Sequence, residues 1–387
     1  MKKKYILTDH FSQWQGLAPF TLTRPISALR IGLRTIQETW SDALETSVEI
    51  QTQAYLMDRT PVVEGLCVII NSAFLCVPDL VEKILALNPG ESLYDHGVQV
   101  ASCVDASASD TKEVELNGAE GWKMLSRPWE IFEWAGEQIE RDFVALTKHQ
   151  NSQVLPEHCV CIGPLDQLFI EDGAEVLSAT FNTLNGPVYV GKNATVMEGS
   201  RVRGPFMMGE GSVLKMNAKI YGSTVLGPHC KVGGEVSNSV FQGYSNKGHD
   251  GYLGNSVIGY WCNLGADTNT SNLKNNYSSV KVYSYLEQDY VNSERQFVGT
   301  FMGDHCKTGI NTMLNTGTVL GVNVNIVGGD FPPKFLPSFS WVNRQKVYTY
   351  RLDKAVDVAK AVMARRQCSM SDIDFSILNH LFETKQP

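Results

Sequence analysis

Long apolar segments are absent from this sequence of 387 residues, and so is the apolar stretch that a secretory signal requires. Three lysines at positions 2–4 precede only Tyr5-Ile6-Leu7 before polar residues begin at Thr8. An excess of positive charge is absent too. The net charge of −8 argues against nucleic acid or an anionic membrane as the main partner. The sequence therefore predicts a cytoplasmic protein.

Cysteine and histidine pairs with metal-binding spacing are also absent. The nine cysteines are scattered, and Cys159 and Cys161 form C-x-C rather than C-x-x-C. We therefore expect reduced and mostly buried thiols. Between residues 186 and 329, no two of His229, His249 and His305 lie four or five residues apart. We expect no metal site built from these side chains.

Glycine is plentiful, and most of the 33 glycines lie between residues 186 and 329. In this region an aliphatic residue recurs at every sixth position: Val190, Val196, Val202, Met208, Leu214, Ile220, Leu226 and Val232. A six-residue period is typical of a parallel β-helix, in which each hexad supplies a short strand and a corner. Adjacent turns must stack to bury the aliphatic side chains. The sequence therefore predicts a hexapeptide-repeat β-helix.

The repeat is interrupted in two places. After Val232 the pattern slips by two residues and resumes with Val240, Tyr252, Ile258 and Leu264, while Asn246 breaks it. No hexad is found from Thr270 to Phe301, and the third block is Met302, Thr308, Leu314, Leu320 and Ile326. A loop as long as 270–301 is usually functional or disordered. Because both interruptions flank His249, we expect the active site there.

Different patterns flank the repeat. Buried strands are expected at 5–8 and 66–70, alternating with helices at 34–40, 80–87 and 129–147, which indicates an α/β domain. After Pro332-Pro333, a helical face is formed by Val356, Ala359, Val362 and Met363, and Ser371 with Asp374 resembles a capping box. We expect domains at 1–155 and 156–335, followed by a C-terminal arm at 336–387.

The densest unusual segment reads Gly248-His249-Asp250-Gly251-Tyr252-Leu253-Gly254-Asn255-Ser256-Val257-Ile258-Gly259, followed by Asn263-Leu264-Gly265-Ala266 and by Asn272. It resembles the acetyltransferase domain of the GlmU family, bifunctional enzymes that make UDP-N-acetylglucosamine. That domain carries G-H-x-x-Y-L-G-[DN]-x-x-I-G, then N-[IL]-G-A and an asparagine. Over most of its length the chain is similar to GlmU-like variants of Bacteroidetes, often labelled sugar-1-phosphate nucleotidyltransferases.

The resemblance implies a GT-A-like nucleotidyltransferase domain, a left-handed parallel β-helix that usually trimerises, and C-terminal helices. It implies a set of roles in acetyl transfer: His249 as general base, Glu235 as its orienting carboxylate, Asn272 near the reacting amine, Tyr252 and Asn263 against the substrate, and Ala266 and Thr300 in the acetyl-CoA site. The chemistry is coherent, because histidine titrates near neutral pH and a carboxylate can stabilise its imidazolium form.

One departure from the family concerns the acceptor. Ser237 occupies a position where the family has a lysine that contacts substrate. The slip in the repeat also blurs the match to a phosphate-binding arginine upstream. Lys215, Lys219 and Lys231 are candidates for that role, and we favour Lys219. The acceptor sugar could therefore differ from glucosamine 1-phosphate.

The amino-terminal part lacks the glycine-rich loop that GT-A nucleotidyltransferases place after their first strand. Residues 17–26 instead resemble the Leu-x-Pro-Leu-Thr-x-x-[Arg/Lys]-Pro element of the GlmU-like branch, and Arg24 and Arg30 are expected to meet phosphate oxygens. Asn71 follows the second strand, where the family usually has a metal-binding aspartate. The domain is either a divergent nucleotidyltransferase that uses Mg²⁺ or a relic that only binds a sugar nucleotide.

Three functions remain open. The first is acetyl transfer from acetyl-CoA to an amino-sugar 1-phosphate, combined with nucleotidyl transfer from UTP to a sugar 1-phosphate. The second is nucleotidyl transfer alone, for example of a thymidylyl group to glucose 1-phosphate, with the β-helix as a trimerisation stalk. The third is a scaffold that binds a sugar nucleotide without catalysis. His249 also has a plain reading as a turn residue, and Tyr252 as a residue that fills the prism.

Overall fold

The computed structural model describes residues 3–57, 61, 64–105, 112–115, 122–328, 330–344 and 346–385. Its contacts divide the chain into two compact units. The N-terminal unit comprises Met1–Leu17, Arg24–Leu29 and Arg34–Arg127, and the β-helix unit comprises Ala18–Thr23, Arg30–Leu33 and Pro128–Pro387. None of the helices in the described ranges has the length and apolar character needed to cross a bilayer. The predicted boundaries at 155 and 335 stay predictions.

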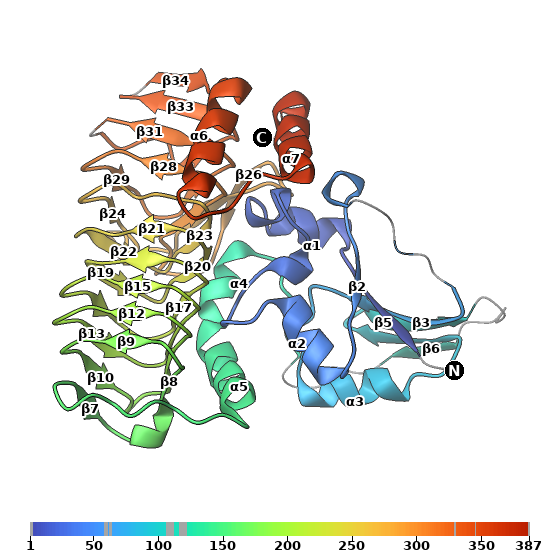
Figure 1. The fold of residues 1–387 in the computed structure, drawn as a ribbon. Coiled ribbons are helices and arrows are strands. Elements are labelled where there is room, and N and C mark those ends of the chain that lie inside the picture. Colours follow the sequence, from blue (N-terminus) through green and yellow to red (C-terminus); the bar gives the residue numbers. More distant parts are fainter. Residues whose placement is uncertain are drawn as a thin grey trace. The chain divides into compact units, whose positions relative to one another are not determined.

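The N-terminal unit contains a six-stranded sheet in the order β2-β1-β3-β5-β4-β6 (Figure 1). Its strands are β1 (Lys4–Thr8), β2 (Glu49–Gln51), β3 (Leu66–Asn71), β4 (Glu91–Asp95), β5 (Val98–Asp105) and β6 (Lys112–Glu115). The helices are α1 (Phe11–Gly16), α2 (Ile36–Ala43) and α3 (Pro78–Ala86), with 3-10 turns η2 (Ile26–Ala28) and η3 (Ala54–Leu56). Strands β1 and β3 pair in parallel, so both predicted buried strands are confirmed.

The helix predicted at 129–147 is two helices, α4 (Pro128–Glu133) and α5 (Ala135–Thr147), which meet at Trp134. Both belong to the β-helix unit, where they pack against β14, β17 and β23 (Figure 1). Their buried residues include Trp129, Ile131 and Phe132 in α4 and Ile139 and Phe143 in α5. The two helices therefore cover one side of the β-helix.

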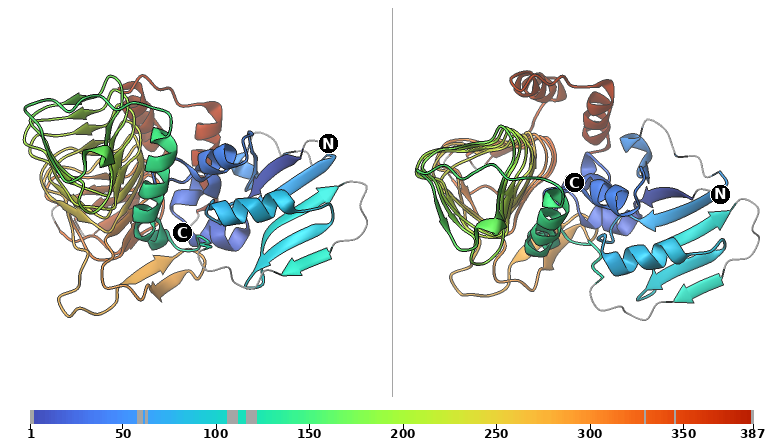
Figure 2. Two further views of the ribbon diagram at one scale, coloured as in Figure 1. Left: turned by 90° about the horizontal axis from the view of Figure 1, so that it is seen from below. Right: turned by 60° about the horizontal axis from the view of Figure 1, so that its bottom comes forward.

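The β-helix winds around a triangular cross-section whose three sides are called faces 1, 2 and 3 (Figure 2). Face 1 consists of β7 (Val160–Ile162), β10 (Thr180–Asn182), β13 (Arg201–Arg203), β16 (Lys219–Ile220), β19 (Glu235–Ser237), β22 (Tyr252–Gly254), β24 (Asn269–Thr270) and β29 (Met313–Leu314). Face 2 consists of β8 (Leu168–Ile170), β11 (Val188–Val190), β14 (Phe206–Met208), β17 (Thr224–Leu226), β20 (Val240–Gly243), β23 (Val257–Tyr260), β27 (Thr300–Met302), β30 (Thr318–Leu320) and β32 (Phe335–Leu336). Face 3 consists of β9 (Glu175–Val176), β12 (Thr195–Val196), β15 (Val213–Leu214), β18 (Lys231–Val232), β21 (Asn246–Lys247), β28 (Lys307–Thr308), β31 (Asn325–Val327), β33 (Ser340–Asn343) and β34 (Lys346–Thr349).

The remaining elements extend this unit. The loop expected at 270–301 carries an antiparallel hairpin of β25 (Lys281–Ser284) and β26 (Asp289–Asn292). Short 3-10 turns lie at η1 (Phe20–Leu22) and η4 (Leu165–Gln167). The chain ends in α6 (Leu352–Ala364) and α7 (Asp372–Thr384). Ser371 and Asp374 form the predicted capping box at the start of α7. The predicted fold class is thereby confirmed.

The aliphatic column of the repeat forms the interior of the β-helix. Strands of one face stack in exact register, as in the row Val190, Met208 and Leu226 on face 2. Every aliphatic residue predicted between Val190 and Val232 belongs to one buried core cluster, and so do Met302, Leu314, Leu320 and Ile326 of the third block. The hexads are therefore confirmed on both sides of the interruption.

Within the interruption, the predicted register is wrong by one residue. The interior positions are Val236, Phe241, Lys247 and Leu253, rather than Val240, Asn246 and Tyr252. The cause is two short steps, because Val232 and Val236 are four residues apart and Val236 and Phe241 are five apart instead of six. Only Gly233 and Gly234 separate β18 from β19, whereas the corners at 215–218 and 248–251 each contain four residues. This short corner lies directly next to the corner that carries His249, because Gly233 donates its N–H to the Lys247 carbonyl at 2.7 Å.

A second interior column on face 2 consists of hydroxyl residues. Thr224, Ser239, Ser256 and Thr300 are fully buried on successive turns. The Ser256 hydroxyl accepts the Thr300 N–H at 2.9 Å, and the Ser239 hydroxyl accepts the Ser256 N–H at 3.3 Å. These hydrogen bonds give partners to backbone N–H groups at the corners, where the regular hydrogen bonding between strands is interrupted.

Candidate functional site

Three predicted site residues form one row on the outer surface of face 1. Lys219, Glu235 and Tyr252 are register partners on the consecutive strands β16, β19 and β22. Neighbouring strands are about 4.8 Å apart, so these side chains lie next to one another. The Lys219 Nζ is 3.7 Å from the Glu235 Oε2, and their side chains are 52% and 38% exposed. Glu235 thus pairs with Lys219 on an accessible polar surface.

Asn272 extends this row beyond Tyr252. Its Nδ2 donates to the Tyr252 hydroxyl at 3.0 Å and to the Asn255 Oδ1 at 2.9 Å. Burial raises the pKa of the Tyr252 phenol, and the Asn272 hydrogen bond acts in the opposite direction. A Cβ at Gly254 would lie 2.2 Å from the phenol oxygen, so only glycine leaves room for this ring. Leu253 fills the prism, and the alternative in which Tyr252 does so is wrong.

His249 lies at the corner between faces 3 and 1 and is exposed. Ala266 occupies the equivalent corner one turn further, because Asn246 and Asn263 are register partners. The Asp267 N–H donates to the Asp250 carbonyl at 3.1 Å and ties the two corners together. A Cβ built on Gly248 would have no atom within 4 Å. The structure therefore places His249 and Ala266 side by side, with open space at the start of the His249 corner.

Lys247 is a residue that sequence reasoning missed. It occupies an interior position between Val232 and Leu264 and is only 1% exposed. Its Nζ donates to the His249 carbonyl at 2.8 Å and to the Gly233 carbonyl at 3.2 Å. Burial lowers the pKa of Lys247 to about 8, against the raising effect of Asp250 and Asp267. A buried ammonium group therefore links the short corner to the backbone of His249. The only feature of the sequence that pointed to this position was the break in the hexad pattern at the adjacent Asn246.

Asn263 lies on a different face from Tyr252. It is exposed on face 3 and forms bridges to Asn246 and Lys307. Arg366, which follows α6, donates from Nη2 to the Asn246 Oδ1 at 2.8 Å. Burial lowers the pKa of Lys231, and the nearby charges of Arg366, Lys215 and Arg365 lower it further. The Asn263 surface is therefore rich in positive charge.

Thr300 is the predicted residue that the structure keeps away from these surfaces. It is 0% exposed in the interior hydroxyl column of face 2. Of the three lysines considered for the phosphate, only Lys219 belongs to the Glu235–Tyr252 row. Lys231 lies on β18 of face 3, and Lys215 follows β15 on that face.

The two arginines predicted to bind phosphate belong to different units. Arg24 is part of the N-terminal unit, whereas Arg30 is part of the β-helix unit. The Arg30 N–H donates to the Gln242 Oε1 at 2.8 Å, and the Gln242 Nε2 donates to the Arg30 carbonyl at 2.9 Å. This reciprocal pair fixes the backbone of Arg30 on β20. Thr23, which precedes Arg24 in the chain, donates its hydroxyl to the Oδ2 of the buried Asp304 at 2.8 Å.

Asp9 places a carboxyl group beside the parallel strands of the N-terminal unit. Asp9 follows β1, and its Oδ2 accepts from the Ile26 N–H at 3.0 Å and from the Thr52 hydroxyl at 2.6 Å. Burial raises the pKa of Asp9 to about 6, although hydrogen bonds from Thr52, Ile26 and Ser72 lower it. Asn71 is buried and bonded to Ala73 and Gln99. In the described part of the chain, no group of three His, Cys, Asp or Glu side chains could hold a metal ion.

Asp9→Asn is expected to stabilise the protein at pH 7.5 by up to about 3 kcal/mol. The pKa of Asp9 is about 6 in the folded state against an ordinary value of 3.8. The folded state therefore favours the protonated form, and wild-type stability falls as pH rises from about 4 to 6. Asparagine mimics that form at all pH values. Urea unfolding at pH 4 and pH 7.5, with the exposed Glu82→Gln as control, checks this. An Asp9→Asn advantage that is equal at both pH values would contradict it.

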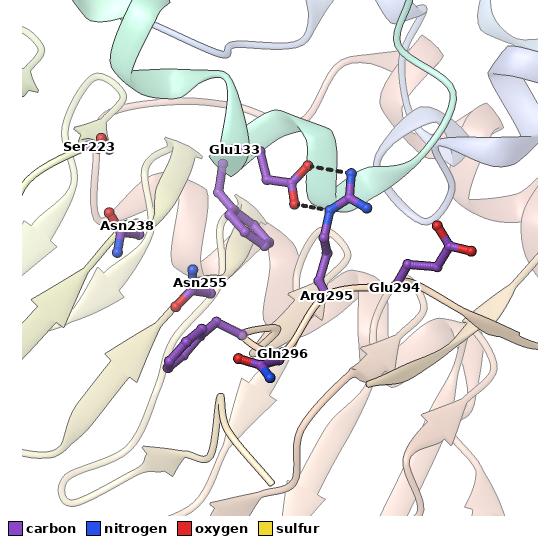
Figure 3. A pocket seen from close by; sticks show the side chains of 9 residues that line it. Glu133, Ser223, Asn238, Asn255, Glu294, Arg295 and Gln296 are labelled. Atoms are coloured by element: carbon purple, nitrogen blue, oxygen red, sulfur yellow. Dashed lines mark hydrogen bonds and ion pairs between the residues drawn. The ribbon is translucent and has the colours of Figure 1, made fainter. Parts of the chain in front are cut away.

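A pocket of about 390 Å³ lies at the corner between faces 1 and 2 (Figure 3). We call it the corner pocket. Its lining residues are Phe132, Glu133, Ser223, Asn238, Asn255, Glu294, Arg295, Gln296 and Phe297. Glu133 comes from α4, and residues 294–297 come from the loop after β26. Asn255, the hydrogen-bond partner of Asn272, connects this pocket to Tyr252.

Comparison with known proteins gives consistent results in both parts of the chain. Residues 5–151 match the family of sugar nucleotidyl transferases. The chain is 32% identical over 236 residues to a bifunctional sugar-1-phosphate nucleotidylyltransferase/acetyltransferase of Sulfurisphaera tokodaii, covering 60% of this chain and 51% of that protein. It is 28% identical over 148 residues to the bifunctional protein GlmU of Trichodesmium erythraeum, covering 38% of this chain and 27% of that one.

A third relative is the bifunctional protein GlmU of Methanococcus aeolicus, with 34% identity over 108 residues, or 27% of this chain and 26% of the relative. The chain thus spans between about a quarter and about half of the length of these relatives. The match to the nucleotidyl transferase family and the similarity to bifunctional GlmU proteins agree with the two architectures described above. Residues 5–151 therefore match the family of sugar nucleotidyl transferases, and the chain is similar to bifunctional GlmU proteins over part of their length.

Proposed function

We propose that the β-helix transfers an acetyl group from acetyl-CoA to the amino group of a sugar 1-phosphate, with glucosamine 1-phosphate as the first acceptor to test. The observation that carries this proposal is the row of Lys219, Glu235 and Tyr252 beside the exposed His249 corner. Similarity to bifunctional nucleotidylyltransferase/acetyltransferase proteins supports it.

In the proposed reaction, the His249 imidazole removes a proton from the acceptor amine as its nitrogen attacks the thioester carbonyl. The new C–N bond forms, the C–S bond breaks, and the coenzyme leaves as a thiolate that takes up a proton. Lys219 holds the phosphate of the acceptor, while Tyr252 and Asn272 hold the sugar near the amine. Glu235 keeps Lys219 in place and supplies negative charge close to the imidazolium form of His249.

The coenzyme is proposed to run past the corners of His249 and Ala266. The positive charges of Lys215, Lys231, Arg365 and Arg366 around Asn263 favour its phosphates over a neutral ligand. Thr300 stays a predicted contact from the sequence, but its full burial gives the proposal no support. Transfer is measured by release of thiol from acetyl-CoA with a panel of amino sugars. Absence of thiol release with every acceptor would overturn the proposal.

We also propose that the protein is a homotrimer whose subunits meet along the β-helix. Large apolar side chains are exposed on face 1 and its corners, including Ile162, Met216, Tyr221, Ile310 and Met313. A cluster of exposed apolar residues is typical of an interaction surface. Light scattering should give about three times the chain mass of 42.8 kDa. A mass equal to that of one chain at micromolar concentration would contradict the trimer.

We further propose that the N-terminal unit transfers a nucleotidyl group from UTP to a sugar 1-phosphate, releasing pyrophosphate. The match of residues 5–151 to sugar nucleotidyl transferases supports it. Here Mg²⁺ would arrive with the nucleotide, because the ligand set in the described residues does not fit a resident ion. The competing proposal is that the unit binds a sugar nucleotide without catalysis. Binding of the nucleotide would require the same contacts to phosphate as nucleotidyl transfer does.

Arg24→Ala is expected to lower pyrophosphate release from UTP and a sugar 1-phosphate at least tenfold, because a charge-assisted contact to phosphate is lost. Acetyl transfer should be unchanged in the same preparation, and chelation of Mg²⁺ should likewise affect only pyrophosphate release. Pyrophosphate release from UTP and from dTTP, each with several sugar 1-phosphates, provides the measurement. If wild-type protein releases no pyrophosphate with any pair, the unit is a binding module. Pyrophosphate release without thiol release would favour a nucleotidyltransferase alone.

A further inference from the structure

The corner pocket carries no unpaired positive charge on its walls. The Arg295 guanidinium makes a two-point contact with Glu133, with Nη2 3.3 Å from Oε2, and this hydrogen bonding raises the pKa of Arg295 (Figure 3). The other charged lining residue is Glu294, which is acidic. A ligand with a phosphate or carboxylate group would face the Arg295 guanidinium, which is already paired with Glu133, and the carboxylates of Glu133 and Glu294. The charge balance therefore favours an uncharged ligand.

The polar wall of the pocket is a column of short neutral side chains. Ser223, Asn238 and Asn255 occupy the corner between faces 1 and 2 on three successive turns, with φ values of 57°, 45° and 46°. This left-handed conformation is uncommon for residues other than glycine and asparagine, and it recurs at corners of the β-helix, including Asn193 and His229 outside the pocket. Figure 3 shows the three side chains one above another. Hydroxyl and amide groups at this spacing offer both donors and acceptors.

Two phenylalanines supply aromatic surface to the pocket. Phe132 is buried and stacks on Phe301 at a centroid distance of 6.3 Å, which fixes its ring. Phe297 is 48% exposed. Apolar surface combined with a few convergent polar groups is the usual composition of a small-molecule site, and 390 Å³ lies within the usual range of about 300–1,000 Å³.

We infer that the corner pocket binds an uncharged hexopyranose ring, with hydroxyl groups meeting Asn238, Asn255 and Ser223 and the carbon face meeting Phe297. Sugar hydroxyls match a wall of amides and a hydroxyl, and the ring's C–H face matches a phenyl group. The pocket also has a route to the acetyl-transfer residues. The Asn272 Nδ2 bonds both the Asn255 Oδ1 and the Tyr252 hydroxyl, so a ligand that competes for Asn255 shifts Asn272 toward Tyr252.

The binding part of this inference does not depend on the proposed acetyl transfer, whereas the coupling through Asn272 rests on it. The position of the pocket restricts what it recognises. Asn255 lines the pocket, whereas Lys219, Tyr252 and Asn272 do not. The corner pocket is thus distinct in its lining residues from the proposed acceptor site, and the two adjoin at the Asn272 amide.

Binding of N-acetylglucosamine to the full-length protein tests this inference, measured by ligand-observed NMR with inorganic phosphate as the charged competitor. Wild type and His249→Ala should bind the sugar equally, and phosphate should not displace it. Phe297→Ala and Gln296→Ala, which alter exposed residues, should each weaken binding at least fivefold, as should Asn238→Asp. Asn193→Asp is the matched control, because Asn193 is an exposed corner residue with φ of 53° outside the pocket.

Binding of the sugar with equal affinity by wild type and the three pocket variants would overturn the inference, as would no binding at 50 mM (about the weakest affinity the method detects). Displacement by phosphate would also overturn it, since it would identify an anion site. If wild type binds the sugar but releases no thiol from acetyl-CoA with any acceptor, the pocket stands and the proposed acetyl transfer fails. If acetyl transfer occurs, N-acetylglucosamine should raise the KM for the acceptor in wild type but not in Phe297→Ala.

Discussion

His249→Ala is expected to lower kcat for acetyl transfer by roughly 10²–10⁴-fold, the usual contribution of a general base. The KM values for acceptor and acetyl-CoA should change little, because His249 acts on the amine proton while Lys219, Tyr252 and Asn272 hold the sugar. The histidine is exposed at a corner, so its removal leaves no cavity in the core. Thiol release from acetyl-CoA with glucosamine 1-phosphate provides the measurement.

The matched control is His229→Asn, because His229 is another corner histidine of the β-helix, with φ of 56°. Its ring packs in a tilted arrangement against Tyr244 at a centroid distance of 4.8 Å, and not against the Tyr252 row. His229→Asn should retain most of the activity. Equal activity of His249→Ala and wild type would show that another group removes the proton.

Lys247→Met is expected to reduce kcat by about 10–100-fold without removing a group that touches substrate. The methionine cannot donate to the His249 and Gly233 carbonyls, so the His249 corner loses its interior anchor. A displacement of about 1 Å at a reacting group can cost about 100-fold in rate. Lys247 is therefore a positioning residue. The acceptor KM should change less than kcat, because face 1 keeps its hydrogen bonds.

The same variant has a distinct signature in stability. The pKa of Lys247 is lowered to about 8 in the folded state from 10.5, so folding opposes its charged form. That cost is full below pH 8 and is relieved as pH rises toward 10.5. Wild type should therefore gain about 3 kcal/mol relative to Lys247→Met between pH 7.5 and 10.5. Urea unfolding at both pH values provides the measurement, with the exposed Lys192→Met as control. A constant difference would contradict a buried ammonium group.

Much of the fold could be predicted because a β-helix has a short and regular period. Each interior side chain from Val190 to Val232 follows from counting six residues, since every strand and corner has the same length there. Counting fails at Gly233 and Gly234, because glycine is compatible with both long and short corners. The break of the helix at Trp134 was also invisible, because its cause is packing of α4 and α5 on the β-helix rather than local propensity.

The candidate site could be predicted only in part. The motif identified Tyr252 and Asn272 but not their hydrogen bond, because the two residues are brought together by the loop after β24. The pairing of Glu235 with Lys219 follows from a strand register that only the corner lengths determine. Thr300 was assigned to the acetyl-CoA site by the resemblance alone, and the hydroxyl column shows that it faces inward.

The β-helix is a one-dimensional stack in which each turn contacts only its two neighbours. Its cohesion along the axis is therefore set by the interior residue of each turn. Most interior positions carry aliphatic side chains, but the turn that contains His249 contributes the ammonium group of Lys247. This turn is held to the preceding one by a hydrogen bond from the Lys247 Nζ to the Gly233 carbonyl, in addition to the apolar contacts of Val236 and Phe241. The joint between these two turns therefore depends on a directional polar contact, and it should respond to the loss of a single proton donor in a way that the purely aliphatic joints do not.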